Sequence, residues 1–257
     1  MSTDTTGQSQ AGAQRRFHGK VCIVSGGGSG IGQATCRRLA GEGGRVVVAD
    51  LNEDHGNETV RLITAAGGQA IFAKCDVSKS ADVQGAVQAA LDKWDRVDVV
   101  VNDAAMMTFT KIVDLDEQDW DRVLAVNLKS VFLFCKYAVP HMKPGGAVVN
   151  VSSVHAHETE HLVVPYATSK GGMEAFTRGF ALECEEAKVR VNCVAPGAVD
   201  TPMLWSNPLV KSGQEKVTGA VGKPEDIAAV IAFLASGEGR FINGTTVVAD
   251  GARLDIL

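Results

Sequence analysis

The segment KVCIVSGGGSGIGQATCRRLAGEG, residues 20–43, decides the fold of this chain. Its beginning is mostly apolar and β-branched, which predicts a buried strand, and the residues after Gly32 have the composition of a helix. The glycines between Ser25 and Gly32 allow the backbone to turn sharply between the two. A strand, a glycine-rich turn and a helix in this order indicate the first unit of an α/β domain.

The same alternation repeats along the rest of the chain. Further strands are expected at 45–50, 69–76, 97–102, 146–153, 189–197 and 245–251, and helices near 54–66, 80–94, 116–142 (two in succession), 166–187 and 224–236. Continuously apolar strands that are separated by helices indicate a parallel sheet covered on both faces. We therefore predict one α/β domain, residues 17–257, with a Rossmann-type doubly wound parallel sheet, preceded by a flexible tail at 1–16.

Composition excludes several classes of protein. The chain has 45% apolar and 21% charged residues, which is typical of a globular domain. A net charge of −5 argues against a nucleic-acid or anionic-membrane partner. No apolar run reaches the length of a membrane span, and the N-terminal residues lack the apolar core of a signal peptide. The six cysteines are scattered without a C-x-x-C pair, so we expect reduced thiols and a cytoplasmic protein.

Polar residues and glycines follow the predicted strands where each strand ends. They are Ser25 to Gly32, Asp50, Asp76, Asn102, Ser152 with Ser153, and Pro196 with Gly197. In a doubly wound sheet the carboxyl ends of the strands form the crevice in which ligands bind. Each residue alone could belong to an ordinary turn, but their joint placement predicts one site at this edge.

The glycine-rich turn at residues 25–32 predicts a dinucleotide site. Glycines let the backbone approach a pyrophosphate, and the helix that follows offers free N–H groups and the positive end of its dipole. Asp50, 18 residues beyond Gly32, can accept hydrogen bonds from the adenosine ribose and would repel a 2′-phosphate. No Arg or Lys lies in the turn or directly after Asp50, so we expect NAD rather than NADP. The alternative for Asp50 is a helix N-cap or turn residue.

Between residues 17 and 251 the chain resembles the short-chain dehydrogenase/reductase family. The family's T-G-x-x-x-G-x-G motif is present at 25–32 with serine in place of threonine, and its P-G-x-V-x-T motif at 196–201. Its N-N-A-G motif is present as NDAA at 102–105, which departs at two of four positions. Its Y-x-x-x-K motif is Tyr166 and Lys170, which by spacing alone could also be two neighbouring surface residues.

The resemblance implies a catalytic set of Asn127, Ser153, Tyr166 and Lys170. Ser153 is selected over Ser152 because it lies thirteen residues before the tyrosine. Tyr166 would be the general acid/base of a hydride transfer, with its phenolate favoured by Lys170. Ser153 would hydrogen-bond the substrate oxygen, and Asn127 would bind a water of a proton relay through its main chain. Asn127 could instead satisfy local backbone.

A larger set of residues is expected to bind the cofactor. They are Ser25, Gly26, Gly28, Ser29, Gly30, Ile31, Gly32, Asp50, Leu51, Asp76, Val77, Asn102, Ala104, Tyr166, Lys170, Pro196, Gly197, Val199 and Thr201. The sequence gives no role to Asp103, although exposure at the strand end is favoured because a buried charge needs partners.

The loop between Ser153 and Tyr166 and the segment 203–221 are expected to border the substrate. His155 lies two residues past Ser153 and is predicted to bind a polar group of a sugar, polyol or hydroxyketone. The segment 203–221 is predicted to be a short lid that contributes Leu204 and Trp205. The histidines of the loop match no metal-ligand pattern, and no metal is expected.

Two classes of function remain open at this stage. The first is an NAD-dependent dehydrogenase of secondary alcohols, with a 3-oxoacyl-thioester reductase as the alternative within the family. The second is an NAD-binding regulatory protein without turnover. The resemblance, together with apolar residues on several sides of the helices at 128–142 and 166–187, predicts a homotetramer.

Overall fold

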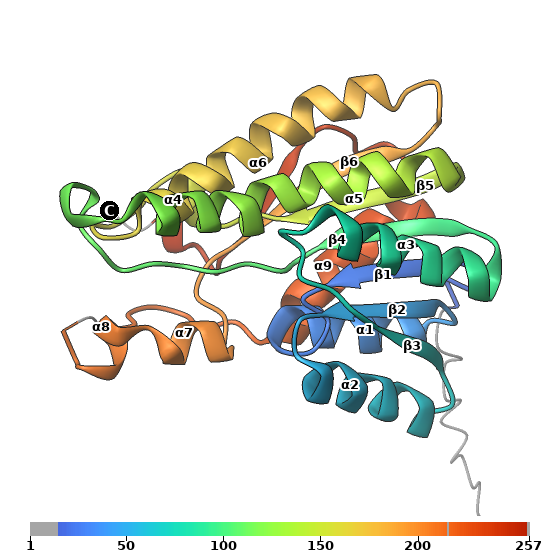
Figure 1. Ribbon diagram of the computed structural model, residues 1–257, viewed down its shortest axis with the longest axis horizontal. Coiled ribbons are helices and arrows are strands. Elements are labelled where there is room, and N and C mark those ends of the chain that lie inside the picture. Colours follow the sequence, from blue (N-terminus) through green and yellow to red (C-terminus); the bar gives the residue numbers. More distant parts are fainter. Residues whose placement is uncertain (1–14, 215, 256–257) are drawn as a thin grey trace, which may run out of the picture.

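The computed structural model describes residues 15–214 and 216–255 and contains a seven-stranded parallel sheet in the order β3-β2-β1-β4-β5-β6-β7 (Figure 1). The strands are β1 (Val21–Ser25), β2 (Arg45–Asp50), β3 (Gln69–Lys74), β4 (Val97–Asn102), β5 (Met142–Val151), β6 (Arg190–Pro196) and β7 (Thr246–Ala249). The chain crosses from β3 to the far side of β1 to form β4. This reversal is the switch point of a doubly wound sheet, so the predicted fold is confirmed.

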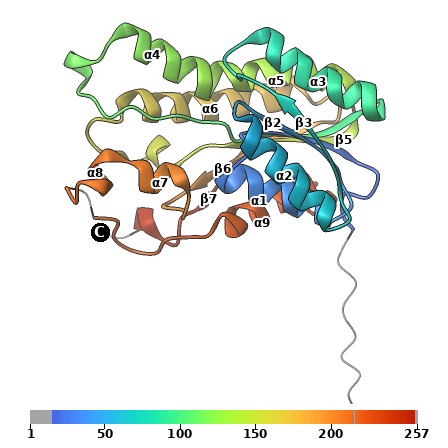
Figure 2. The ribbon, with the colours of Figure 1, turned by 60° about the horizontal axis from the view of Figure 1, so that its bottom comes forward.

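Helices cover both faces of the sheet (Figures 1 and 2). They are α1 (Gly30–Gly41), α2 (Glu53–Ala65), α3 (Ser80–Trp94), α4 (Glu117–Leu124), α5 (Ser130–Ala138), α6 (Val164–Glu183), α7 (Pro202–Ser206), α8 (Pro208–Lys211) and α9 (Pro224–Ala235). One apolar core contains side chains of α3, α5 and α6, and a second contains side chains of α1, α2 and α9. The helices therefore form two layers with the sheet between them.

Strand β1 shows why these runs are continuously apolar. Val21 and Ile23 lie in the core with α3, α5 and α6, whereas Cys22 and Val24 lie in the core with α1, α2 and α9. Successive side chains of a strand point to opposite faces, so a strand buried on both faces needs apolar residues throughout. All five residues of β1 are buried.

The predicted pair of helices at 116–142 forms a continuous helical run, Glu117–His141. Its middle, Ala125–Lys129, is a π-helical segment that contains Asn127. By length and composition this run could cross a membrane, a possibility that the sequence analysis did not find. Leu133, Phe134 and Cys135 lie in the core against the sheet, which accounts for much of its apolar character.

Most boundaries differ from the predicted ones by a few residues. Residues 1–14 of the expected tail lie outside the described residues. Arg16, the last residue of that segment, pairs with Glu42 and Glu238. The segment 203–221, expected to be a lid, begins with the short helices α7 and α8, which Figures 1 and 2 place together at one end of the sheet.

Candidate active site

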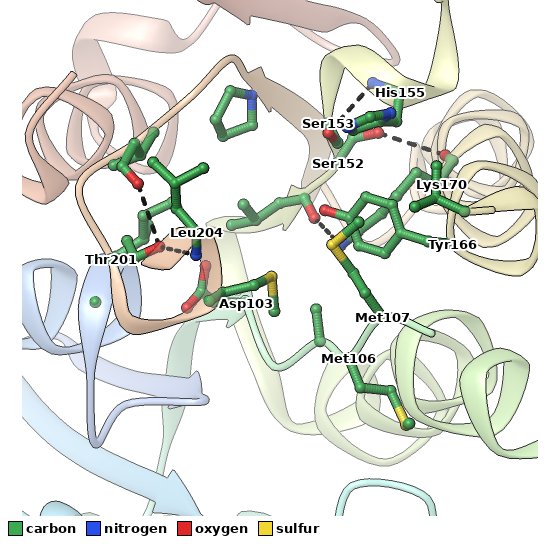
Figure 3. Close-up of a pocket in the computed structure, with 18 of the residues that line it drawn as sticks. Asp103, Met106, Met107, Ser152, Ser153, His155, Tyr166, Lys170, Thr201 and Leu204 are labelled. Carbon is green, nitrogen blue, oxygen red and sulfur yellow. Dashed lines mark hydrogen bonds between the residues drawn. The ribbon is translucent and has the colours of Figure 1, made fainter. Parts of the chain in front are cut away.

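The carboxyl ends of the strands border a cavity of about 610 Å³. Ser29, Gly30 and Ile31 line it on the side of α1, and Tyr166 and Lys170 line it on the side of α6. Figure 3 draws the latter two together with Ser153, which comes from the end of β5. Residues far apart in the sequence are therefore brought to one cavity, at the edge where the sequence predicted a site.

The glycine-rich turn has a shape that only glycines allow. Gly26 has a φ of +68°, and a Cβ there would lie 2.9 Å from the backbone of Ala104. The turn leads into α1, whose N-cap residue Ser29 makes no side-chain cap bond. The first N–H groups of a helix have no intrahelical partner, so this end of α1 offers donors at the cavity.

Asp50 faces the glycine-rich turn from the end of β2. Its carboxylate accepts hydrogen bonds from the N–H of Gly28 and from the N–H of Asn52, both at 2.8 Å. The N-cap of α2 is Asn52, which accepts from the N–H of His55, so Asp50 does not cap this helix. Asp50 lines the cavity next to Leu51, which is 61% exposed.

These features fit a dinucleotide. The start of α1 supplies donors for a pyrophosphate, Asp50 supplies an acceptor for ribose hydroxyls, and Leu51 and Val77 supply apolar surface along the cavity wall. The remaining expected cofactor residues that line the cavity are Gly26, Asp76, Ala104, Pro196, Gly197, Val199 and Thr201. Ser25, Gly28, Gly32 and Asn102 do not line this cavity and support the residues that do.

Two of these supporting residues join neighbouring strands. The Ser25 hydroxyl accepts from the N–H groups of Asp103 and Ala104 at 3.1 and 3.3 Å, which joins β1 to the residues after β4. The Asn102 amide donates to the Asn150 side chain at 2.8 Å, which joins β4 to β5. The Asn102 side chain is therefore bonded through its nitrogen, while its oxygen is buried without a hydrogen-bond partner beside the altered residues of the NDAA motif.

Tyr166 and Lys170 lie on one face of α6, one turn apart, and are 7% and 1% exposed. The Lys170 ammonium donates to the carbonyl oxygen of Val151 at 2.6 Å. Its nitrogen lies 5.5 Å from the centre of the Tyr166 ring. The pair is therefore a buried cation beside a buried phenol, and not two neighbouring surface residues.

Burial shifts the pKa values of both groups. It raises the pKa of the Tyr166 phenol to about 12, against a hydrogen bond with Ser153 that lowers this pKa. Burial also lowers the pKa of Lys170 to about 8, although the nearby Asp103 carboxylate favours the ammonium and so raises this pKa. Without a further positive charge Tyr166 is a neutral phenol at neutral pH, so a base at this position needs a cation in addition to Lys170.

The two serines after β5 have different partners. Ser153 is the hydrogen-bond partner of Tyr166, and its oxygen also accepts from the N–H of His155 at 3.2 Å. Ser152 donates to the buried carboxylate of Glu174 at 2.9 Å. These contacts support the selection of Ser153, and not Ser152, as the residue that meets the substrate oxygen.

Asn127 holds the loop after β4 against α6. Its side chain accepts from the N–H of Met106 at 2.8 Å and donates to the carbonyl of Met106 at 2.9 Å and to Ser169 at 3.0 Å. Asn127 is fully buried and does not line the cavity. Its side chain is thus structural, and the water contact implied by the resemblance would involve its main chain.

Asp103 lies at the cavity, between the glycine-rich turn and Lys170. A Cβ on Gly32 would lie 2.8 Å from its carboxylate, which accepts a hydrogen bond from the Gly32 N–H. Burial raises the pKa of Asp103 to about 7, against Lys170 and this hydrogen bond, which favour the carboxylate. The expectation that Asp103 is exposed at the strand end is therefore wrong, because the glycine-rich turn packs against it.

The substrate end of the cavity holds only part of the expected set. His155 lines it and meets the edge of the Tyr166 ring, with ring centres 5.7 Å apart. Leu204 also lines it. Trp205 does not, because its indole N–H donates to Asp200 at 2.6 Å and the side chain is 46% exposed.

Most residues of the apolar wall were not predicted from the sequence. Met107 and Phe109 follow β4, Leu209 lies on α8, and Leu254 follows β7. The cavity is also lined by Arg122 and Arg253, of which Arg253 donates to the Thr218 carbonyl. Met107, Phe109 and Leu254 come after strands at the edge where ligands bind, which is the signal that could have identified them.

No group of three His, Cys, Asp or Glu side chains among the residues described here could hold a metal ion. His155 interacts with Thr159, with 3.1 Å between its ring nitrogen and the hydroxyl oxygen, and His157 pairs with Glu174. His155 and His157 are thus engaged with side chains of the protein.

Comparison with known proteins extends this picture. A family model described as Enoyl-(Acyl carrier protein) reductase matches residues 26–252. The chain is 37% identical over 242 residues to 3beta-hydroxysteroid dehydrogenase 1 of Eggerthella lenta, which covers 91% of this chain and 93% of that protein. It is 36% identical over 242 residues to 3-oxoacyl-[acyl-carrier-protein] reductase FabG of Thermotoga maritima, which covers 92% of this chain and 98% of that protein.

Among solved structures, the fold is similar to a short chain dehydrogenase from Burkholderia cenocepacia in complex with NADP. The TM-score is 0.86 at 31% identity, and the match covers 92% of this chain and 98% of that chain. The similarity therefore extends over most of the chain.

Proposed function

Because the chain belongs to the short-chain dehydrogenase/reductase family and is an oxidoreductase of CH–OH groups, we propose that it uses NAD(H) to interconvert a largely apolar secondary alcohol and its ketone. The observation that carries this proposal is the placement of Ser153, Tyr166 and Lys170 across one cavity from the glycine-rich turn. The regulatory alternative has no need of such a buried acid/base pair.

The residues around the substrate oxygen would act together. The nicotinamide cofactor supplies the hydride acceptor and, in its oxidised form, a positive charge. Tyr166, as the phenolate that Lys170 would stabilise, takes the alcohol proton at its phenol oxygen and becomes a neutral phenol. Ser153 donates a hydrogen bond to the substrate oxygen and stabilises the charge that develops there. In the reverse direction Tyr166 returns the proton to the forming alkoxide.

The preference for NAD over NADP is supported by Asp50. Its carboxylate lies at the end of β2 with its oxygens held by Gly28 and Asn52, next to the uncharged Leu51. A 2′-phosphate at this position would meet a negative charge without a neighbouring cation in the glycine-rich turn. The related structure with NADP shows that the family also accepts the phosphorylated cofactor, so this assignment depends on Asp50 itself.

The nature of the substrate is supported by the cavity wall. Met107, Phe109, Val163, Leu204 and Leu254 give it apolar surface. This lining favours a substrate with an apolar body, in keeping with the hydroxysteroid dehydrogenase relative, over the sugar or polyol that His155 suggested from the sequence. His155 would then contact the polar reacting end rather than additional hydroxyl groups.

Initial rates of NADH formation test the proposal directly. Cyclopentanol, a 3β-hydroxysteroid and a polyol would each be offered with NAD⁺ at equal concentration. We expect turnover of the two alicyclic alcohols and little with the polyol. Turnover of the polyol alone would restore the polar-pocket expectation, and no NADH from any alcohol would reject the assignment.

The FabG relative makes a 3-oxoacyl-thioester reductase the second candidate. A protein with this second function would reduce an acetoacetyl thioester with NADPH faster than an NAD-dependent alcohol dehydrogenase would. Asp50 argues against it, because reductive biosynthesis normally uses the phosphorylated cofactor. Reduction of acetoacetyl-CoA with NADPH and with NADH separates the two candidates.

We also propose a homotetramer in the cytoplasm. Large apolar side chains are exposed on two separate parts of the surface, Phe132 on α5 at 45%, and Phe241 and Val248 near β7 at 101% and 43%. Two self-complementary contacts are what a tetramer with closed symmetry requires. All six cysteines are free and buried, which suits a reducing compartment. Light scattering at micromolar concentration tests the assembly, and a monomeric mass would reject it.

A further inference from the structure

Glu174 is a buried acid that the proposed mechanism does not use. It lies on α6 one turn after Lys170, is 5% exposed, and does not line the cavity. One of its carboxylate oxygens accepts from the Ser152 hydroxyl at 2.9 Å and lies 3.2 Å from a ring nitrogen of His157. A buried carboxylate is unfavourable unless it is paired, so these two contacts account for its presence inside the protein.

The two partners of Glu174 lie on either side of Ser153. Ser152 precedes it directly, and His157 follows after the short turn Val154–Ala156, whose N-cap is Ser153 itself. The segment from Ser152 to His157 is thus attached to α6 at both ends. Lys170 holds the residue before it, because its ammonium donates to the carbonyl of Val151.

Tyr166, Lys170 and Glu174 occupy successive turns on one face of α6. The helix therefore carries both the phenol and the acceptor that holds the serine segment. The relative position of the Ser153 hydroxyl and the Tyr166 phenol is set by a rigid helix on one side and by the Glu174 contacts on the other.

We propose that Glu174 is a positioning residue that places Ser153 against Tyr166 through Ser152 and His157. It touches neither substrate nor cofactor, and its effect on the reaction passes through the serine segment. The inference rests on the proposed function, in which Ser153 and Tyr166 act on the same substrate oxygen.

The first test compares Glu174→Ala with Glu174→Gln. Alanine removes both contacts, and we expect kcat to fall roughly 10- to 100-fold, the scale of a misplaced catalytic group. Glutamine keeps an acceptor oxygen of the same size for Ser152 and His157, and should restore most of kcat. The dissociation constant of NADH should be unchanged in both variants, because the cofactor side of the cavity is untouched. Glu183→Ala, an exposed acid on the same helix, is the matched control and should behave as wild type.

The second test does not depend on activity. Hydrogen–deuterium exchange of the peptide that covers residues 152–160 should increase in Glu174→Ala and remain near wild type in Glu174→Gln and Glu183→Ala. If Glu174→Ala fails to fold, Ser152→Ala and His157→Ala each remove one contact while the carboxylate keeps the other. Each should lower kcat relative to wild type and leave NADH affinity unchanged, and wild-type kcat in both variants would overturn the positioning role.

The outcomes separate this inference from the proposed function. Three results would overturn the positioning role in a protein whose wild type oxidises alcohols. They are a wild-type kcat in Glu174→Ala, an equal loss of kcat in Glu174→Ala and Glu174→Gln, and a loss of kcat that is accompanied by a loss of NADH affinity. Unchanged exchange of residues 152–160 in Glu174→Ala would overturn it as well, whatever the substrate. A wild-type protein that binds NADH and oxidises no alcohol would instead reject the proposed function.

Discussion

The two ends of the cavity are held by different kinds of contact. At the cofactor end, the glycine-rich turn and Asp50 are held by backbone N–H groups just after β1, β2 and β4. At the substrate end, the wall comes from loops after β4 and β5, the short helices α7 and α8, and the turn after β7. Backbone contacts at strand ends follow from the order of the strands in the sheet, whereas the loop wall depends on which side chains meet across the cavity. The two ends should therefore respond differently to substitution.

Tyr166→Phe should have the largest effect, because both ends of the cavity meet at this residue. The variant loses the phenol oxygen that exchanges the proton, and we expect kcat to fall by roughly 10²–10⁴-fold with NADH affinity unchanged. Steady-state kinetics and NADH fluorescence titration measure the two quantities.

The other tyrosine provides the control for this substitution. Tyr137 bonds to Ser80 through its hydroxyl and lies outside the cavity, so Tyr137→Phe should keep wild-type kcat. Wild-type turnover in Tyr166→Phe would remove Tyr166 from the mechanism.

The next largest effect is expected at the cofactor end. Wild type should prefer NAD⁺ over NADP⁺ in kcat/KM, because Asp50 would accept hydrogen bonds from the ribose and would repel a 2′-phosphate. Asp50→Asn combined with Leu51→Arg should lower this preference by roughly 100-fold, on the scale of about 1.5–3 kcal/mol for a hydrogen bond to a charged group. Leu51→Arg alone separates the new cation from the lost carboxylate. Equal wild-type efficiency with both cofactors would contradict the assignment.

The contrast between the two ends also explains what the sequence could predict. Apolar strands, the glycine-rich turn and the spacing of Tyr166 and Lys170 are local patterns, and the fold that they predict is confirmed. The partial burial of Asp103 was missed because it depends on the glycine-rich turn packing against the end of β4. Trp205 was expected in the cavity because it is large and apolar, but the nearby Asp200 carboxylate accepts its indole N–H and holds it elsewhere. Which loop residues meet in space is a tertiary property that spacing along the chain does not encode.

Substitutions in the apolar wall should have moderate effects that depend on the substrate. Met107→Ser and Leu204→Ser should each lower kcat/KM for alicyclic alcohols by roughly 10-fold, because each removes apolar contact with the substrate body. Trp205→Phe should leave kcat/KM unchanged, since this side chain faces Asp200. His155→Ala on the same panel tests the polar expectation. A selective loss of polyol turnover in His155→Ala would favour a polyhydroxylated substrate over one with an apolar body.

The smallest predicted effect concerns Asp103. Its carboxylate favours the Lys170 ammonium, so Asp103→Asn should lower the pKa of Lys170 below its value of about 8. Loss of the ammonium then begins at lower pH, and the basic limb of the pH profile of kcat/KM for ketone reduction should shift to lower pH. The two profiles should converge below about pH 7, where Asp103 itself takes up a proton.

Asp92→Asn serves as the control for this shift. Asp92 is exposed on α3, so the substitution removes the same charge at a position outside the cavity. A basic limb that stays in place or moves to higher pH in Asp103→Asn would show that Asp103 does not act on Lys170.

The most direct measurement follows deuterium from the carbinol carbon of a secondary alcohol to NAD⁺. Wild type should convert carbinol-deuterated cyclopentanol or 3β-hydroxysteroid to the ketone and yield reduced cofactor that carries the deuterium by mass spectrometry. Tyr166→Phe should bind NADH normally and yield almost none. Reduced cofactor without deuterium, or no reduced cofactor from any secondary alcohol with a protein that binds NADH, would contradict a hydride transfer assisted by Tyr166.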